Sequence, residues 1–159
     1  MSANQPSVTY FDPKFRISLE LPADWSTGHT DDFPLILLAP PEMDYRSNLG
    51  FSQSDQPIAS PEALDGIIAG AKAEQLAGYS RFRQLKEERF WQDGRPAFLQ
   101  QYQWQPEDAQ HPFVQLFGLV LVGPDNLLEI NGATLQPLAE RYLPVLQKIV
   151  SSIRFIPES

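Results

Sequence analysis

The hydrophobic pattern of the chain is strongest at residues 113–122, which are Phe-Val-Gln-Leu-Phe-Gly-Leu-Val-Leu-Val. Nine of these ten residues are apolar or glycine, and the turn-forming sequence Gly-Pro-Asp-Asn follows directly. A short run that is apolar at consecutive positions predicts a strand with both faces covered. It is too short to cross a membrane as a helix. We therefore place residues 113–122 in the middle of a β-sheet and expect the other elements to surround it.

The segments on either side of this strand predict an antiparallel meander. Residues 80–91 are polar but contain three aromatic side chains, and we interpret them as a long strand at the edge of the sheet. The Asp-Gly pair at 93–94 is the strongest hairpin signal in the chain, and residues 96–105 form the returning strand. Residues 127–133 alternate apolar and polar side chains. Because short connections join these strands, each is expected to pair with the next.

The first half of the chain predicts shorter strands. Residues 8–11 are compatible with a short opening strand, and residues 15–21 alternate strictly, as a half-buried strand does. Trp25 follows a proline that ends this strand, and we expect its side chain to fold back over the sheet edge. Residues 35–39 and 47–52 predict two further strands.

A first helix is predicted between these strands and the meander. Ser60 is a suitable N-cap, Pro61 suits the first helical position, and Gly78 is expected to end the helix. Its apolar stripe is predicted to consist of Leu64, Ile67, Ile68, Ala71 and Leu76. Gly66 and Gly70 lie four residues apart, and we expect them to allow close packing of this helix on the sheet.

A second helix is predicted over residues 138–153, and Pro144 should kink it or mark where it begins. The order of three strands, a helix, four strands and a helix predicts one α+β domain with helices available for both faces of the sheet. We place this domain at residues 8–156. Residues 1–7 are small and polar, and we expect them to be flexible.

Composition narrows the function classes. A chain of 159 residues with 42% hydrophobic content is large enough for one core without disulfides or metals. Cysteine is absent, which excludes thiol catalysis and thiolate metal sites and is compatible with a reducing cytoplasm. The formal charge of −8 argues against nucleic-acid binding, which needs clustered Lys and Arg. The N-terminal residues resemble no secretory signal, so we expect a cytoplasmic location without membrane insertion.

No group of residues has the pattern of a catalytic site, so we predict that the chain is not an enzyme and uses no cofactor. His29 lies in a Gly-His-Thr-Asp-Asp segment that resembles a metal loop, but a solvated turn explains it better, and we predict no metal site. His111 is interpreted as a surface residue. Glu129 is the best single candidate for a catalytic acid, yet alternation explains it as the outward member of a half-buried strand.

The aromatic residues of the meander are the one functional feature. They lie on neighbouring predicted strands and are accompanied by glutamines, a combination that can accept an apolar partner and satisfy its polar backbone groups. The predicted partner-binding residues are Trp91, Phe98, Tyr102, Trp104 and Phe117. An aromatic core beneath a helix is the alternative, and it is the more common arrangement.

The order of these motifs resembles the PsbP-like superfamily over residues 8–155. The resemblance is carried by the Leu21-Pro22-x-x-Trp25 turn, the Ser60-Pro61-Glu62 helix start, the Asp93-Gly94-Arg95 hairpin and the closing Ile153-Arg154-Phe155. It implies an α/β/α sandwich with a mostly antiparallel sheet of about six or seven strands and helices on both faces. The superfamily includes photosystem II PsbP proteins, a Ran-binding nuclear-import factor of yeast, DcrB-like bacterial proteins and cytoplasmic chaperones of type VI secretion effectors.

The strand Tyr102-x-Trp104 resembles the DcrB-like and effector-chaperone branch, in which the sheet of a dimer grips apolar transmembrane segments of the cargo. This resemblance implies a non-catalytic adaptor or chaperone that presents an aromatic sheet face to an apolar or transmembrane segment of a protein partner, and it is compatible with a homodimer. A PsbP-type photosystem II assembly or accessory protein is one alternative, and an uncharacterised small hydrolase is another. Fold membership alone does not assign a function.

Overall fold

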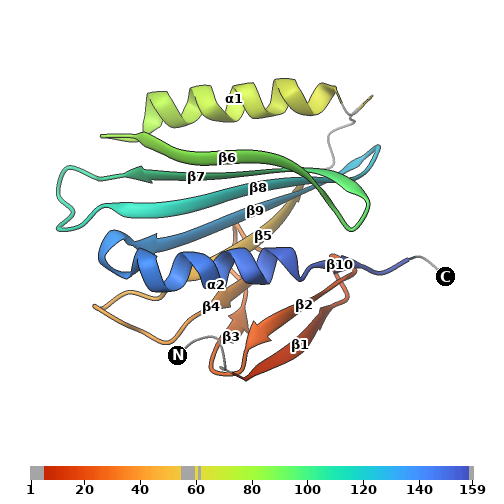
Figure 1. Cartoon of the computed structure of the whole chain (residues 1–159), viewed down its shortest axis with the longest axis horizontal. Helices are drawn as coiled ribbons and strands as arrows, with labels where there is room; N and C mark the ends of the chain where they lie inside the picture. Colours follow the sequence, from red (N-terminus) through yellow and green to blue (C-terminus); the bar gives the residue numbers. More distant parts are fainter. Residues whose placement is uncertain (1–5, 55–59, 61, 158–159) are drawn as a thin grey trace.

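The computed structural model describes residues 6–54, 60 and 62–157, which form two antiparallel sheets and two α-helices (Figure 1). The larger sheet has seven strands in the order β3-β4-β5-β9-β8-β7-β6. Its strands are β3 (Ser26–Gly28), β4 (Leu35–Leu38), β5 (Asn48–Ser54), β6 (Arg83–Gln92), β7 (Arg95–Trp104), β8 (Phe113–Gly123) and β9 (Asn126–Leu135). The smaller sheet contains β1 (Ser7–Asp12), β2 (Ile17–Pro22) and β10 (Arg154–Phe155).

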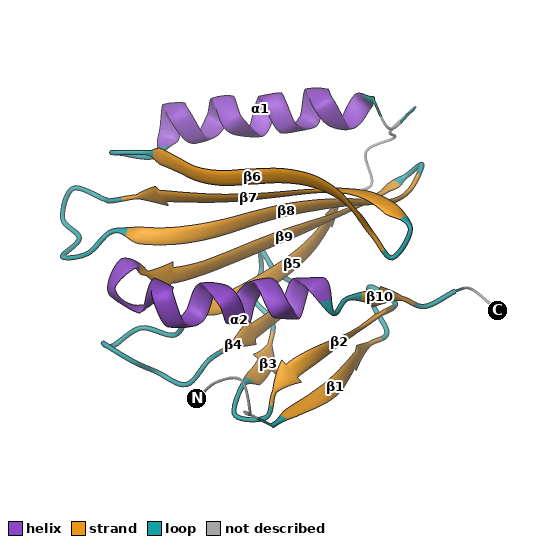
Figure 2. Ribbon diagram, viewed as in Figure 1, coloured by secondary structure: helices purple, strands orange, loops and turns teal. Residues whose placement is uncertain are grey.

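The two helices lie on opposite faces of the large sheet, which gives the expected α/β/α arrangement (Figure 2). Alternate side chains of β8 show this directly, because Leu116 and Val120 belong to the core beneath α2 (Ala139–Ser151). Phe117 and Leu119 belong to a second core beneath α1 (Ala63–Gly78). The fold class predicted from the sequence is therefore confirmed.

The meander β6-β7-β8-β9 is antiparallel throughout, as the short connections predict. Its β6–β7 turn places Asp93 at φ +50° and Gly94 at φ +82°, the left-handed conformations that a tight Asp-Gly hairpin requires. β8 is enclosed by β7 and β9, but β9 is the central strand of the seven. β6 is an edge strand of this sheet, as predicted.

The N-terminal strands do not extend the large sheet. β1 pairs with β2, and β2 pairs with β10 on its other side, so the chain ends meet in a separate small sheet. Ile17, Leu19 and Phe155 of this sheet contribute to the core beneath α2. Trp25 also lies in this core, where its ring centroid is 6.3 Å from that of Tyr142. The small sheet and α2 therefore cover the same face of the large sheet together.

α1 differs from its sequence prediction at both the start and the packed face. The helix starts at Ala63 with Glu62 at the N-cap position and no side-chain cap, so Ser60 is not the N-cap, and Pro61 lies outside the described residues. Leu76 is 69% exposed, whereas Gln75 is buried. The reason is that the side-chain amide of Gln75 is hydrogen-bonded to that of Gln100 on the sheet.

The glycines of α1 do not contact the sheet. Gly66 and Gly70 are exposed, and a Cβ atom added to either would meet nothing within 4 Å. The prediction of close glycine packing is therefore wrong. Only Leu64, Ile68 and Gln75 of α1 are buried. A helix with two internal glycines and so few buried side chains gains little stability from either propensity or packing.

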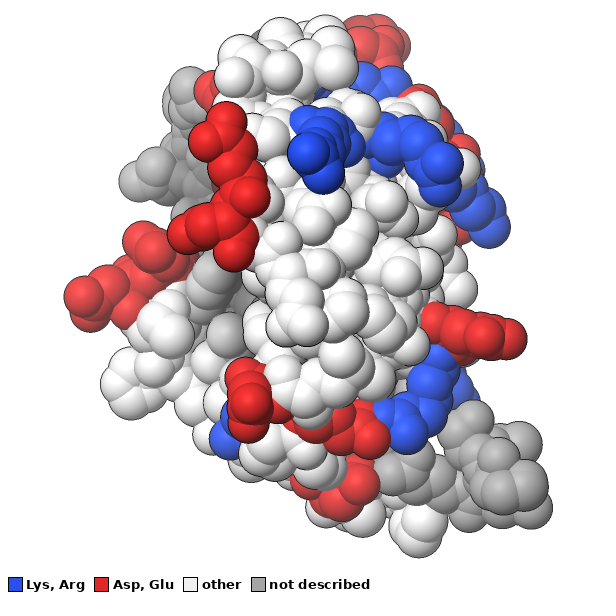
Figure 3. Space-filling model, turned by 90° about the vertical axis from the view of Figure 1, so that its left-hand side faces the viewer, with Lys and Arg blue, Asp and Glu red and all other residues white. Residues whose placement is uncertain are grey.

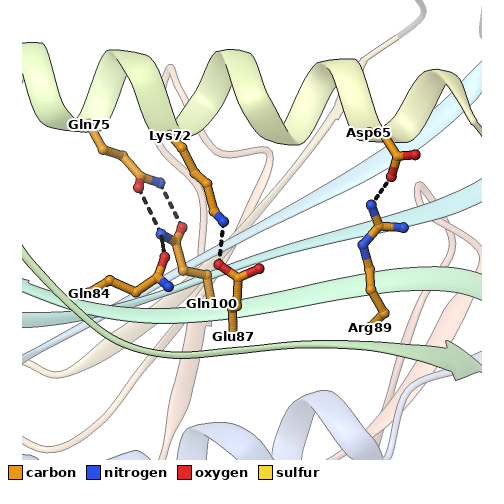
Figure 4. Close-up of polar contacts among 7 residues, drawn as sticks. All are labelled: Asp65, Lys72, Gln75, Gln84, Glu87, Arg89 and Gln100. Atoms are coloured by element: carbon orange, nitrogen blue, oxygen red, sulfur yellow. Dashed lines mark hydrogen bonds and ion pairs between the residues drawn. The ribbon is translucent and has the colours of Figure 1, made fainter.

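Polar contacts supply much of the attachment of α1 to the sheet (Figure 4). Lys72 is ion-paired with Glu87 of β6, and Asp65 is ion-paired with Arg89 of the same strand. Both pairs are solvent-exposed, so each contributes only about 0–1 kcal/mol. A buried amide pair, Gln75 of α1 with Gln100 of β7, lies beside the Lys72–Glu87 pair, on the side away from Asp65 and Arg89 (Figure 4).

α2 is a continuous helix in which Pro144 lies in the second turn, and a short 3₁₀ turn, Gln136–Leu138, leads into it. Its buried face, Tyr142, Leu146, Ile149 and Val150, belongs to the core that α2 forms with β9 and β2. Neither helix of the described residues has the length and hydropathy of a bilayer-spanning segment.

Candidate functional site

Three of the five predicted partner-binding residues lie beneath α1. Phe98, Tyr102 and Phe117 have exposed fractions of 1%, 3% and 9% and pack with Leu64 and Ile68 of the helix. The aromatic sheet face that was expected to be open is therefore covered by α1 at these positions. Here the structure shows the alternative arrangement, an aromatic core under a helix.

Trp91 is separated from the other four. It is 72% exposed, and it borders a hollow of about 500 Å³ between β6 and the end of α2. Val150 and Arg154 line the same hollow, together with polar side chains such as Glu88. A large exposed aromatic residue beside a hollow is a typical contact point for a partner, but it does not form one surface with the remaining aromatic residues.

Trp104 lies at the end of β7 in a continuous row of aromatic rings. Its ring centroid lies 4.5 Å from that of Tyr79, which follows α1, and 5.8 Å from that of Phe113 at the start of β8. The members of this aromatic row are, in order, Phe82, Tyr102, Tyr79, Trp104, Phe113 and Tyr45. Neighbouring ring centroids in the row are 4.5 to 5.8 Å apart.

The aromatic row is accessible over most of its length. Tyr102 is buried, but the other five rings are partly exposed. Its polar atoms are oriented by neighbouring amides: the Trp104 indole N–H donates to Oε1 of Gln115, and the side-chain amide of Asn48 donates to the Tyr45 hydroxyl over 3.3 Å. These contacts hold the rings in place and leave their apolar faces available to a partner.

The local sequence explains how the row is assembled. Trp104 and Phe113 are opposite each other in the β7–β8 pairing, so the register of this hairpin alone brings them together. Tyr79 follows Gly78 where α1 ends, and Tyr45 lies in the loop before β5. Sequence analysis identified Trp104 and Tyr102 as site residues but missed Tyr45, Tyr79 and Phe82, because helix ends and loops carry no periodic signal.

The end of the sheet where β7 ends and β8 begins has few charges. Figure 3 shows this end of the molecule, the left-hand side of Figure 1, with a broad central area free of Lys, Arg, Asp and Glu. Charged side chains lie above and below that area. An uncharged area of this kind on a chain of net charge −8 is a candidate contact surface.

A second hollow, of about 220 Å³, lies between the C-terminal half of α1 and strands β7 to β9. It is lined by Ala71, Glu74, Gln75, Tyr79, Tyr102, Phe117, Glu129 and Asn131. Burial, and secondarily the negative charge of Glu74, raises the pKa of Glu129 above its ordinary value. Glu129 was expected to point outward on the alternation of its strand, and the structure places it facing α1 and partly buried in this hollow.

In residues 6–54, 60 and 62–157, no cluster of three or more His, Asp or Glu side chains is arranged to hold a metal. The loop containing His29 is largely exposed. His111 is partly exposed in the β7–β8 loop.

Neither a protein-family profile nor any of the curated proteins compared matches the sequence. Solved structures do match the fold. LpqN of Mycobacterium tuberculosis, described as involved in cell envelope biogenesis, is 13% identical with a TM-score of 0.66, covering 97% of this chain and 92% of LpqN. CyanoP, the PsbP of Synechocystis sp. PCC 6803, is 12% identical with a TM-score of 0.62, covering 94% of this chain and 92% of its own.

The Ran-binding protein Mog1p of Saccharomyces cerevisiae is 12% identical with a TM-score of 0.60, and the match covers 96% of this chain and 97% of Mog1p. Similarity at sequence identities this low shows a shared fold only. The expected PsbP-like fold is therefore confirmed, and the match extends over nearly the whole of each chain.

Proposed function

We propose that this chain is a non-catalytic protein-binding protein, an adaptor or chaperone, that holds an apolar segment of a partner against the aromatic row. The observation that carries the proposal is the row itself: five partly exposed rings from four separate parts of the chain converge on an end of the sheet that has few charges (Figure 3). Aromatic side chains that remain partly exposed but are held rigidly are the usual anchors of protein interfaces.

The polar groups near the row suit a peptide partner. An apolar segment brings backbone N–H and C=O groups that need hydrogen bonds when they leave water. Gln115 on β8, Asn131 on β9 and Asn48 on β5 offer amide groups on the α1 side of the sheet, and all three are partly exposed. A surface of rings interspersed with amides can therefore accept both the side chains and the backbone of such a segment.

The fold comparisons are compatible with a binding role. Mog1p carries the fold and is described as a Ran-binding protein. The more specific role, a cytoplasmic chaperone of the DcrB-like and effector-chaperone kind with a transmembrane segment as cargo, is part of our proposal and rests on the sequence resemblance around Tyr102 and Trp104.

Site-specific photo-crosslinking tests the proposal. A photoreactive phenylalanine analogue at Phe113 should crosslink a partner in cells of the source organism, and the crosslinked partner peptide, identified by mass spectrometry, should be an apolar segment. The same analogue at Phe11, which is 54% exposed on the small sheet, is the matched control and should give no such product. Identical products from both positions, or a polar partner peptide at Phe113, would overturn the proposal.

The same experiment distinguishes the alternative functions. Crosslinks to photosystem subunits at Phe113 would favour a PsbP-type accessory protein, an alternative that the CyanoP fold keeps open. A hydrolase would instead be indicated by turnover of a small substrate that depends on Glu129, the carboxyl group whose pKa is raised by burial and then by Glu74.

A further inference from the structure

We propose that the 220 Å³ hollow between α1 and strands β7 to β9 is a binding site for an alkylammonium ion, either a free small molecule or the end of a lysine side chain. The hollow adjoins the aromatic row, because Tyr79 and Tyr102 belong to both. The proposal does not depend on the partner segment, because it rests on the walls of the hollow alone.

The first wall is aromatic. Tyr79 and Tyr102 are stacked, with ring centroids 5.6 Å apart and an interplanar angle of 24°, and both line the hollow with Phe117. The electron-rich face of an aromatic ring attracts a cation, and the attraction is stronger when the cation is desolvated. The three rings give one side of the hollow an aromatic surface, which suits a methylated ammonium group.

The second wall carries negative charge without a cation. Glu129 of β9 and Glu74 of α1 line the hollow from opposite sides. The ion pairs among the described residues join other carboxylates, those of Glu42, Asp65, Glu87 and Asp93, to their cations. Burial and Glu74 both raise the pKa of Glu129, so a cation in the hollow would relieve an existing electrostatic cost. The hollow is therefore complementary to positive charge.

The size and chemistry of the hollow favour an organic cation over a metal ion. A volume of about 220 Å³ corresponds to roughly seven water molecules at about 30 Å³ each, enough for a small ammonium compound. Calcium and magnesium require about six oxygen ligands. Among the described residues no three His, Asp or Glu side chains are placed to hold a metal ion, whereas the aromatic and acidic lining of the hollow suits an alkylated nitrogen.

Tyrosine NMR provides a direct test. The chain has five tyrosines, and in a sample with ¹³C-labelled tyrosine each ring signal can be assigned with a Tyr→Phe variant. Titration with choline should shift the signals of Tyr79 and Tyr102 saturably. The signals of Tyr10 and Tyr142, which lie with the other core, should not move.

Two comparison ligands define the chemistry. The neutral isostere of choline, 3,3-dimethylbutan-1-ol, should produce no saturable shift, because it has the shape of choline without its charge. N-acetyl-lysine methylamide represents a lysine side chain, and whichever of the two cations binds more tightly identifies the source. Equal binding of choline and the alcohol, or no saturable shift with either cation, would overturn the proposal.

Charge-matched variants complete the test. Glu129→Gln should weaken cation binding at least tenfold, whereas Glu140→Gln, an exposed change on α2 at the opposite face, should leave it unchanged. Both variants remove one negative charge, so a general electrostatic effect would affect them equally. Wild-type affinity in a folded Glu129→Gln protein would contradict the proposed role of the hollow.

Discussion

The side-chain amides of Gln75 and Gln100 form two reciprocal hydrogen bonds across the interface between α1 and the sheet. Nε2 of Gln75 donates to Oε1 of Gln100 over 2.8 Å, and Nε2 of Gln100 donates to Oε1 of Gln75 over 2.9 Å (Figure 4). Nε2 of Gln100 also donates to Oε1 of Gln84 over 2.9 Å. Both members of the pair are buried, so this contact fixes the position of α1 over the aromatic core.

We predict that breaking one side of this amide pair destabilises the protein more than removing both sides. Gln100→Ala leaves the buried amide of Gln75 without its partner, and the free energy of unfolding should fall by about 1–3 kcal/mol. The double variant Gln75→Leu with Gln100→Leu replaces both amides by apolar groups and should lie within about 1 kcal/mol of the wild type. Urea denaturation measures both values. A double variant less stable than Gln100→Ala would show that the pair stabilises the fold by itself.

We predict that replacing the exposed glycines of α1 by alanine stabilises the protein. Gly66→Ala and Gly70→Ala fill open, exposed helical positions, and each should stabilise the protein by about 0.5–1 kcal/mol. Gly132→Ala in β9 is the opposing control, since its Cβ would lie 2.9 Å from Leu49 Cδ1 and 3.3 Å from the backbone oxygen of Asn48. It should destabilise by about 1–3 kcal/mol. Thermal unfolding distinguishes the two directions, and destabilisation by Gly66→Ala would indicate a contact that the structure does not show.

We predict that the contribution of Glu129 to the free energy of unfolding depends on pH. Its folded-state pKa is raised, by burial and then by Glu74, so the folded protein binds its proton more tightly than the unfolded chain does. Stability must therefore decrease as the pH rises from the ordinary glutamate value through the raised one, and Glu129 is destabilising at neutral pH. Glu129→Gln should raise the thermal midpoint at pH 7 by about 1–3 °C, and this gain should disappear near pH 4. A gain that persists unchanged at pH 4 would contradict this account.

Elements with strong local signals were predicted correctly from the sequence. The β6–β7 hairpin follows from its Asp-Gly turn, and β8 follows from its apolar run, because both signals lie within the element itself. β10 has two residues and β3 has three, which is too short for a detectable period. The pairing of β10 with β2 joins opposite ends of the chain, and alternation shows which face of a strand is buried but not which strand lies beside it.

The candidate site was predicted only in part, for a related reason. Phe98, Tyr102 and Trp104, which were predicted as partner-binding residues, all lie on one face of β7. Which part of that face remains accessible depends on where α1 lies, and this is determined by Gln75 and its partner Gln100 on β7. In a predicted helix a glutamine is expected to face solvent. Leu76 was therefore assigned to the buried face in place of Gln75.

The central claim is that a partner binds at Trp104 and its neighbours in the aromatic row, and comparison of two tryptophan variants tests it most directly. Affinity purification from the source organism in mild detergent, quantified by mass spectrometry, would use the wild type, Trp104→Ala and Trp91→Ala. We expect the wild type and Trp91→Ala to retain the same partner with an apolar segment. Trp104→Ala should lose it while its thermal midpoint stays within a few degrees of the wild type. Retention of the partner by folded Trp104→Ala, or its loss from both variants alike, would contradict the claim.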